Sequence, residues 1–172
     1  MAVTPMQMAV AYSAIANGGT ILWPRLVERI EPQDPVSGKT ATNFPSGLVR
    51  DEIGVSVRSL RILRDAMLSE TEDPDGTGYP AFHQSDLDLK LRVCGKTGTA
   101  QVKNARGNLT GWNYWFASFA PYDNPRYAVV VMVESENPGS GGSVCAPIAR
   151  DIYAEILKKE NTPAAKNLAT TD

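Results

Sequence analysis

Leu91-Arg92-Val93-Cys94-Gly95-Lys96-Thr97-Gly98-Thr99-Ala100-Gln101-Val102 is the stretch that decides how this chain folds. It predicts a β-strand, because apolar residues lead into a run in which two threonines alternate with a glycine. Thr97 and Thr99 are two residues apart, so they would point to the same face and offer two hydroxyls side by side. Lys96 places an ammonium where the buried strand reaches the surface, and Gly98 would let another extended backbone approach closely.

This combination of groups suits the binding of an extended peptide that ends in a carboxylate. The cation and the hydroxyls would hold the carboxylate, and the free main-chain groups would pair with the peptide as an added strand. Two alternatives stay open on these residues alone. Lys96-Thr97-Gly98 could be an ordinary edge-strand turn, or Gly95-Lys96-Thr97 could end a phosphate loop of pattern G-x-x-x-x-G-K-[ST]. The phosphate loop is disfavoured, because Lys90 stands where it needs a glycine and no amphipathic helix follows Thr97.

Length and composition bound the class of protein. The 172 residues suit one domain or a large part of one, and 42% hydrophobic and 21% charged residues are typical of a globular protein. The net charge of -2 does not favour nucleic acid as a partner. No apolar run is long enough to span a bilayer, and no signal peptide is evident.

Cysteine and histidine are too few to predict a metal site. Cys94, Cys145 and the single histidine, His83, do not make a ligand pattern, so neither a metal nor a cofactor is expected. The two cysteines are predicted to be buried free thiols, and His83 to be a surface residue.

The rest of the chain predicts three helices. The first begins at Thr4-Pro5-Met6-Gln7, which combines an N-cap, a first-turn proline and a capping box, and it ends at Asn17-Gly18-Gly19. Its alanines and methionines predict an interior position. Helical spacing of apolar residues predicts a second helix over residues 56–69 and a closing helix over 144–159.

The strands predict an α+β fold, an antiparallel β-sheet flanked by α-helices. Residues 91–102, 114–120 and 127–133 are joined by short connections, which is typical of an antiparallel meander. Residues 20–30 are predicted to be a short strand pair or an extended run. Residues 31–47 are predicted to be a loop or a hairpin excursion. The acidic and glycine-rich segment 70–78 and the glycine-rich segment 137–143 are predicted to be loops or turns, and 79–90 to be irregular. Residues 161–172 contain no large apolar cluster and are predicted to be a disordered tail.

Four segments, in their order and spacing, resemble the transpeptidase domain of penicillin-binding proteins. The similarity runs from Val3 to about Leu157 and is greatest to the class B, elongation-type enzymes called penicillin-binding protein 2. It implies a serine β-lactamase/transpeptidase-like fold, of which residues 3–160 would be the carboxyl-terminal part. The segments resemble the family's long helix, its K-[ST]-G box, the next strand and the closing helix; they are Val3-Thr4-Pro5-Met6-Gln7-Met8-Ala9 with Ala16-Asn17-Gly18-Gly19, Gly95-Lys96-Thr97-Gly98-Thr99-Ala100-Gln101, Trp115-Phe116-Ala117-Ser118-Phe119-Ala120-Pro121 and Ala146-Pro147-Ile148-Ala149-Arg150.

The family's nucleophilic serine is missing from this sequence. That serine stands in an S-x-x-K box, and none of the serines here has a lysine three residues later. Ser135-Glu136-Asn137 spells the second box, S-x-N, but it follows the K-T-G strand instead of preceding it, so we interpret it as a chance match. The chain is therefore expected to be inactive alone and to need the upstream half of the same catalytic domain as a partner.

The resemblance implies a function and a role for each residue of the K-T-G strand. The parent would be a peptidoglycan D,D-transpeptidase, in which a serine attacks a D-Ala-D-Ala stem peptide and the acyl group passes to an amine. Lys96 would supply positive potential and help bind the terminal carboxylate. Thr97 and Thr99 would hydrogen-bond that carboxylate, with Gly98 allowing close approach. The Thr99 N–H would be an oxyanion-hole donor.

The resemblance also implies partners and a location. Stem peptides and β-lactam antibiotics would bind, and a cell-elongation complex that controls cell shape is a further expected partner. The chain would lie in the periplasm or on the extracytoplasmic face of the bacterial inner membrane, with the anchor outside this chain. Two alternatives stay open, namely a non-catalytic module that binds stem peptides or β-lactams, and a structural scaffold. Trp112, Tyr114 and Trp115 could line the cleft or belong to the core.

Overall fold

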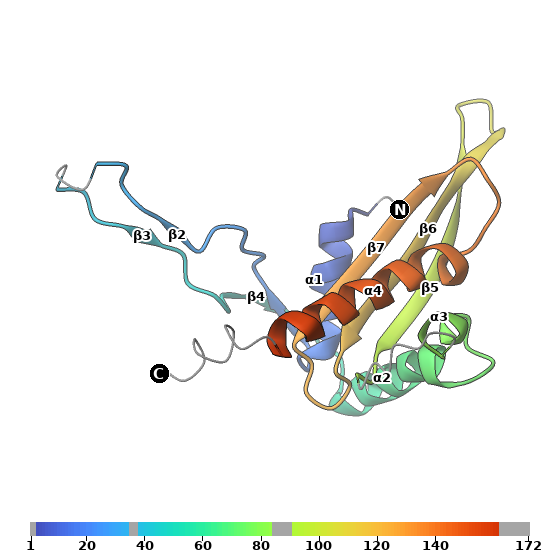
Figure 1. The fold of residues 1–172 in the computed structure, drawn as a ribbon, viewed down its shortest axis with the longest axis horizontal. Helices are drawn as coiled ribbons and strands as arrows, with labels where there is room; N and C mark the ends of the chain where they lie inside the picture. The colour runs from blue at the N-terminus through green and yellow to red at the C-terminus, as the bar shows by residue number, and fades with distance from the viewer. Residues whose placement is uncertain (1–2, 35–37, 84–90, 162–172) are drawn as a thin grey trace.

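A three-stranded antiparallel sheet forms the centre of the molecule (Figure 1). The computed structural model describes residues 3–34, 38–83 and 91–161. The sheet consists of β5 (Cys94–Lys103), β6 (Leu109–Ala120) and β7 (Tyr127–Ser135), in the order β5-β6-β7. The register pairs Lys96 with Ala117 and Ala117 with Val130. The predicted meander is confirmed, and the K-T-G segment lies on its edge strand.

The hairpin between β5 and β6 is longer than the sequence predicts. The strand predicted over residues 114–120 begins earlier in the structure, because β6 starts at Leu109. A tight turn closes the hairpin, in which the Asn104 N–H donates to the Asn108 carbonyl at 2.9 Å. Gly107 in this turn has a φ of 80°, which a residue without Cβ adopts at no steric cost.

Helices cover both faces of the sheet, which confirms the α+β class. In Figure 1, α4 (Gly141–Asn161) crosses one face and α1 (Pro5–Ala16) lies behind the other. Alternate residues of β6 serve the two faces, as a strand requires. Phe116 packs with Tyr153 of α4, whereas Phe119 packs with Ala16 of α1 and Met67 of α2 (Val57–Glu72).

The predicted cap of α1 is present, but its predicted interior position is wrong for this chain. The Gln7 N–H donates to the Thr4 hydroxyl at 3.2 Å, and the Thr4 N–H donates to the Gln7 side chain at 2.9 Å. Only Ala14 and Ala16 of the helix are buried, and Met6 is 45% exposed. The apolar surface of α1 is therefore only partly covered.

Three helix boundaries differ from the prediction. The expected loop 70–78 is wrong over its first residues, because α2 continues to Glu72, and 79–83 form α3 (Tyr79–His83) instead of an irregular segment. The buried Thr71 hydroxyl donates to the Val93 carbonyl at 2.5 Å, which holds the last turn of α2 against the residue that precedes β5. The helix α4 starts at Gly141, inside the expected glycine-rich turn. The expected tail 161–172 is wrong at its first residue, because α4 includes Asn161. Residues 84–90 and the rest of that tail, 162–172, lie outside the described residues.

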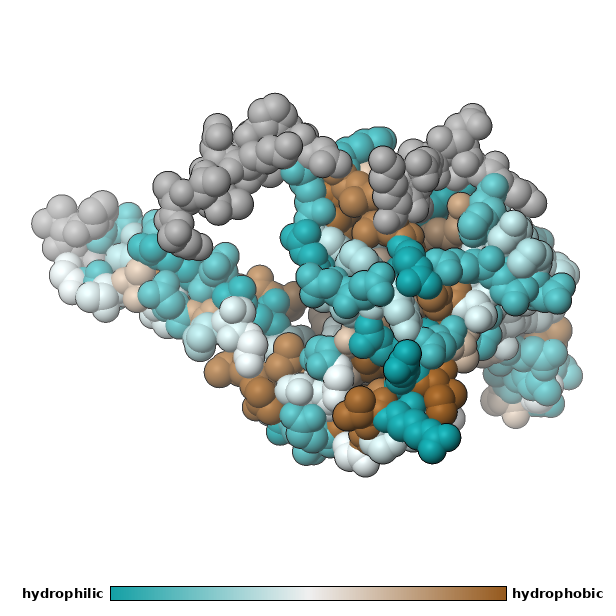
Figure 2. Space-filling model, turned by 90° about the horizontal axis from the view of Figure 1, so that it is seen from below, coloured by the Kyte–Doolittle hydropathy of each residue, from teal (hydrophilic) through white to brown (hydrophobic). Residues whose placement is uncertain are grey.

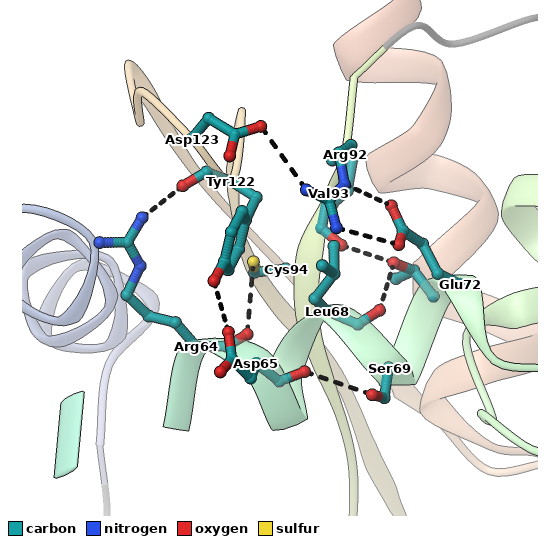
Figure 3. A network of polar contacts seen from close by, with 11 residues as sticks. Arg64, Asp65, Leu68, Ser69, Glu72, Arg92, Val93, Cys94, Tyr122 and Asp123 are labelled. Atoms are coloured by element: carbon teal, nitrogen blue, oxygen red, sulfur yellow. Dashed lines mark hydrogen bonds and ion pairs between the residues drawn. The ribbon is translucent and has the colours of Figure 1, made fainter. Parts of the chain in front are cut away.

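A network of polar contacts fixes α2 to the sheet (Figure 3). The aromatic ring of Tyr122, in the β6–β7 turn, lies between the guanidinium groups of Arg64 and Arg92, whose central carbons are 5.2 and 4.8 Å from its centroid. Arg64 also donates to the Tyr122 carbonyl. Arg92 pairs with Glu72 at 3.1 Å and with Asp123 at 3.6 Å. These contacts set where the end of α2 lies relative to β5.

Residues 20–52 form an arm of short paired strands. The strand β1 (Thr20–Leu22) pairs with β4 (Val49–Glu52), and β2 (Arg29–Ile30) pairs with β3 (Thr42–Asn43). The antiparallel pairing of β2 with β3 agrees with the hairpin alternative for residues 31–47. Figure 1 shows the arm projecting from the body. Figure 2 shows hydrophobic residues exposed among hydrophilic ones on the face of the molecule that is seen from below Figure 1. None of the described helices is both long and apolar enough to cross a bilayer.

Both cysteines are buried free thiols within the described chain, as predicted. Burial raises the pKa of Cys94 to about 12 and also raises the pKa of Cys145. Because the thiolate is the reactive form, we expect neither to react with a disulfide reagent at pH 8 unless the chain is unfolded. Thiol counting with and without denaturant checks this, and rapid labelling of the folded chain would contradict it.

Candidate active site

The segment Lys96–Thr99 lies on the exposed edge of the sheet. The side chain of Lys96 is 58% exposed, Thr97 is half-buried and Thr99 is exposed. The Thr97 N–H donates to a carboxylate oxygen of Glu70 at 3.4 Å, so the main chain of Thr97 faces away from β6. In an antiparallel strand this orientation repeats every second residue. The N–H and C=O of Thr99 therefore face the open edge, where an extended ligand could pair with them.

A carboxylate that the sequence analysis missed lies beside this segment. Glu70 Oε1 accepts from the Thr97 hydroxyl at 2.8 Å and from the Thr77 hydroxyl at 2.5 Å. Its other oxygen, Oε2, is 3.5 Å from the Lys96 ammonium. One feature of the sequence could have predicted the position of Glu70. Thr71 lies three residues beyond Leu68 and therefore extends the buried face of α2. A helix that continues this far brings Glu70 to β5.

The surroundings of Glu70 favour its charged form. Burial raises its pKa, but the hydrogen bonds from Thr77 and Thr97 and the ammonium of Lys96 lower it by more, so the pKa lies below its ordinary value. These contacts therefore stabilise the folded chain at neutral pH. Their contribution is lost as the pH falls through the folded-state pKa.

Gly98 has a close neighbour within the protein, at the start of α4. A Cβ on Gly141 would lie 2.7 Å from the Gly98 carbonyl oxygen and 2.2 Å from that of Trp115. The start of α4 thus lies directly against the K-T-G strand, on the side opposite to that where a Cβ of Gly98 would point. Within the described chain, the backbone that comes close to Gly98 is that of Gly141 at the start of α4.

The other residues singled out in the sequence lie on β6, β7 or α3 or in the segment after β7, and not on the edge strand itself. Tyr114 is 1% exposed and donates to the Asn137 carbonyl at 2.7 Å, so it belongs to the core. Trp112 and Trp115 are half-buried. Ser135 ends β7 opposite Trp112, and the Asn137 N–H donates to its hydroxyl at 3.1 Å. Exposed His83 stacks on Tyr79.

The chain is similar to one protein family over most of its length. The family described as "Penicillin binding protein transpeptidase domain" matches residues 1–154. Peptidoglycan D,D-transpeptidase MrdA of Haemophilus influenzae is 33% identical over 167 residues, which cover 91% of this chain and 24% of that protein. Stage V sporulation protein D of Bacillus subtilis is 35% identical over 172 residues, which cover 97% of this chain and 25% of that protein. The chain spans about a quarter of the length of these relatives.

Solved structures of penicillin-binding proteins and of a D,D-transpeptidase domain also superpose on this chain. Penicillin-binding protein 3 of Mycobacterium tuberculosis in its apo form superposes with a TM-score of 0.71 and 29% identity, covering 94% of this chain and 36% of that one. The same protein complexed with ampicillin has a TM-score of 0.70 and 28% identity over the same shares. The D,D-transpeptidase domain of a peptidoglycan glycosyltransferase from Eggerthella lenta has a TM-score of 0.68 and 28% identity, covering 92% of this chain and 33% of that one.

Proposed function

Because this chain belongs to the penicillin-binding protein transpeptidase family, we propose that it is the carboxyl-terminal part of the catalytic domain of a class B peptidoglycan D,D-transpeptidase. The observation that carries the proposal is the edge strand, which presents Lys96, two threonines and outward-facing main-chain groups in one row. That row suits an acyl peptide that ends in a carboxylate. Relatives with different printed names match at 33% and 35% identity, so the elongation type stays a prediction.

The residues of the edge take separate roles in this proposal. Lys96 supplies the positive charge that attracts the substrate carboxylate and favours the charged states of the reaction. Thr97, Gly98 and Thr99 bind the peptide along the edge. The N–H of Thr99 stabilises the oxyanion, because it points to the side of the strand on which the substrate would lie.

The acylating serine comes from a segment that this chain does not contain. The sequence contains no S-x-x-K box, and the chain spans about a quarter of the length of the relatives that it matches. An apolar groove of about 600 Å³ between α1 and the arm, lined by residues such as Met6, Val10 and Trp23, suits cover by the upstream half of the domain. It shares no residue with the Lys96 edge. The complete enzyme would act outside the cytoplasm, where stem peptides are cross-linked.

We expect that the purified chain forms no covalent adduct with a fluorescent penicillin. Acylation needs a serine activated by a neighbouring base, and no serine here has the lysine spacing that supplies one. Denaturing gel electrophoresis after incubation checks this, with a complete class B enzyme as the positive control. Stoichiometric labelling of the chain would show that its nucleophile lies within these 172 residues.

A non-catalytic binding module is the second candidate, and the exposed edge strand of a chain without S-x-x-K favours it. A module of this kind would bind N-acetyl-D-Ala-D-Ala by itself, reversibly and without turnover. Isothermal titration of the purified chain distinguishes the two. Saturable binding favours the module, whereas binding that appears only when the upstream segment is supplied favours the transpeptidase.

A further inference from the structure

A carboxylate of the protein lies beside the position that the proposed function gives to the carboxylate of the ligand. Glu70 Oε2 is 3.5 Å from the Lys96 ammonium, and Glu70 Oε1 accepts from the Thr97 hydroxyl at 2.8 Å. The side chain of Glu70 is 12% exposed and that of Lys96 58%, so water screens the charge of Glu70 poorly. A ligand that ends in a carboxylate therefore approaches two groups that serve an anion of the protein.

Two carboxylates and one ammonium would leave the site with a net negative charge. In the free chain, Lys96 and Glu70 balance each other. The ligand adds a second negative charge beside the same cation, and like charges at such short range raise the pKa of at least one of the two acids. Glu70 is the acid that responds, because its buried position gives its charged form less stabilisation by water than the ligand carboxylate receives at the open edge.

The hydrogen bonds of Glu70 change in the same direction. In the free chain, Glu70 Oε1 accepts from the hydroxyls of Thr97 and Thr77, at 2.8 and 2.5 Å. The Thr97 hydroxyl has a single proton, so a Thr97 that turns this proton to the ligand withdraws a donor from Glu70. A protonated carboxyl group can itself donate, so a neutral Glu70 restores the contact with Thr97 in the reverse sense.

The groups around Glu70 leave the two carboxylates to share one cation. Within the described chain, that cation is Lys96 of β5, and Thr77, between α2 and α3, adds a hydroxyl. Tyr12 of α1 also faces Glu70, and burial together with the charge of Glu70 raises its pKa, so it stays neutral. The first residues of α4, Gly141-Gly142-Ser143, pack against the Thr77 carbonyl and carry no charged side chain.

We propose that Glu70 couples the binding of a ligand carboxylate at this edge to the uptake of one proton from solvent. The proton joins the Glu70 carboxylate, the ligand enters as an anion, and Lys96 then faces one negative charge instead of two. Departure of the ligand returns the proton to solvent. Glu70 acts through Lys96 and Thr97, so it is a positioning residue. The inference rests on the proposed function for the nature of the ligand.

The coupling gives binding a pH dependence of defined sign. In the free chain the pKa of Glu70 lies below its ordinary value, and the bound ligand raises it. The complex then holds more protons than the free protein, so affinity for an anionic ligand rises as the pH falls between the two pKa values. Below the pKa of the free chain, Glu70 is protonated in both states and the dependence ends.

The first experiment tests the contact between Glu70 and Lys96 in this chain, without a ligand. The carboxyl ¹³C signal of Glu70 is titrated by NMR in the wild type, Lys96→Met and Lys103→Met. Lys96→Met is expected to raise the pKa of Glu70, because the cation that favours its charged form is removed. Lys103→Met removes the same charge at the far end of β5 and should leave the curve in place. An unchanged curve in Lys96→Met would overturn the proposal.

The second experiment compares acylation of the complete enzyme by penicillin and by its methyl ester between pH 7 and pH 5. Glu70→Gln has no charge and its amide can donate to Thr97, so it imitates the protonated state. It is expected to react with penicillin about tenfold faster than the wild type at pH 7, the factor that one pKa unit represents. This advantage should shrink as the pH falls. With the ester, which brings no charge, the two enzymes should react alike.

Glu155→Gln is the control with the same change in net charge. Glu155 is exposed on α4 and pairs with Lys158, so its loss should leave the rate unchanged at each pH. An equal or slower rate of Glu70→Gln at pH 7, or an advantage that does not vary with pH, would count against the coupling alone. If not even the wild-type enzyme is acylated, the proposed function fails and the coupling fails with it. The first experiment needs no variant of Glu70, so it decides the contact even if Glu70→Gln does not fold.

Discussion

Replacing Lys96 by alanine is expected to reduce acylation of the complete enzyme by penicillin about 10²- to 10³-fold, the loss that removal of one electrostatic stabiliser causes. Lys96 brings the positive charge nearest to the proposed carboxylate position, and Thr97 and Thr99 carry none. Its side chain is 58% exposed, so stability should change by no more than about 0.5 kcal/mol. Stopped-flow acylation and urea unfolding of the same preparations measure both quantities.

Lys103→Ala is the control for Lys96→Ala. Lys103 lies on the same strand and is exposed, but it pairs with Leu109 at the far end of the hairpin. Its loss should leave the acylation rate within about twofold, because exposed charges further away than a Debye length are largely screened. If Lys96→Ala were acylated as fast as Lys103→Ala, Lys96 would serve only the fold.

Gly141→Ala is expected to destabilise the chain strongly, although it adds a single methyl group. Its Cβ would lie 2.2 Å from the Trp115 carbonyl oxygen, and 2.7 and 2.9 Å from the carbonyl oxygen and nitrogen of Gly98. These are main-chain atoms of a paired sheet, so they cannot rotate away. The helix α4 must then move off the sheet, which exposes the fully buried Tyr153 and its neighbours. We expect a loss of about 3 kcal/mol, because overpacking of a tight contact costs this much.

Gly139→Ala is the matched control for this substitution. A Cβ at Gly139 would lie 3.3 Å from side-chain atoms of Tyr114 and Val144, which can shift, and no main-chain atom of the sheet is among its nearest neighbours. Its cost should stay below about 1 kcal/mol. Urea unfolding of the two variants decides the matter: similar midpoints would show that α4 has room to adjust at Gly141.

Local signals predicted the elements that depend on neighbours in the sequence. The capping box of Thr4 and Gln7 formed as predicted, and the second helix starts where predicted, with Ser56 as its cap. The three strands pair in the predicted order, because short connections leave an antiparallel meander as the simplest arrangement. These outcomes rest on steric and hydrogen-bonding rules that act within a few residues.

Long-range contacts decided the boundaries that the sequence placed wrongly. The last turn of α2 is held by the bond from Thr71 to Val93, which is 22 residues away. An acidic segment that looks like a loop by composition therefore stays helical. The start of α4 at Gly141 likewise depends on packing against Gly98 and Trp115, where glycine is used for its small size and not as a turn former. An acidic or glycine-rich composition is compatible with a loop and with the end of a helix, so composition alone could not distinguish these two structures.

The amino-acid sequence by itself determined the family resemblance and the edge strand, because the order of Lys96, Thr97, Gly98 and Thr99 and the period of two are properties of the local chain. Only the tertiary structure decided that the Glu70 carboxylate lies against this strand, beside Lys96 and Thr97. The physical reason is that the charge state of a carboxylate depends on the donors and cations that lie close to it in space. Those groups here come from a strand 26 and 27 residues later in the chain.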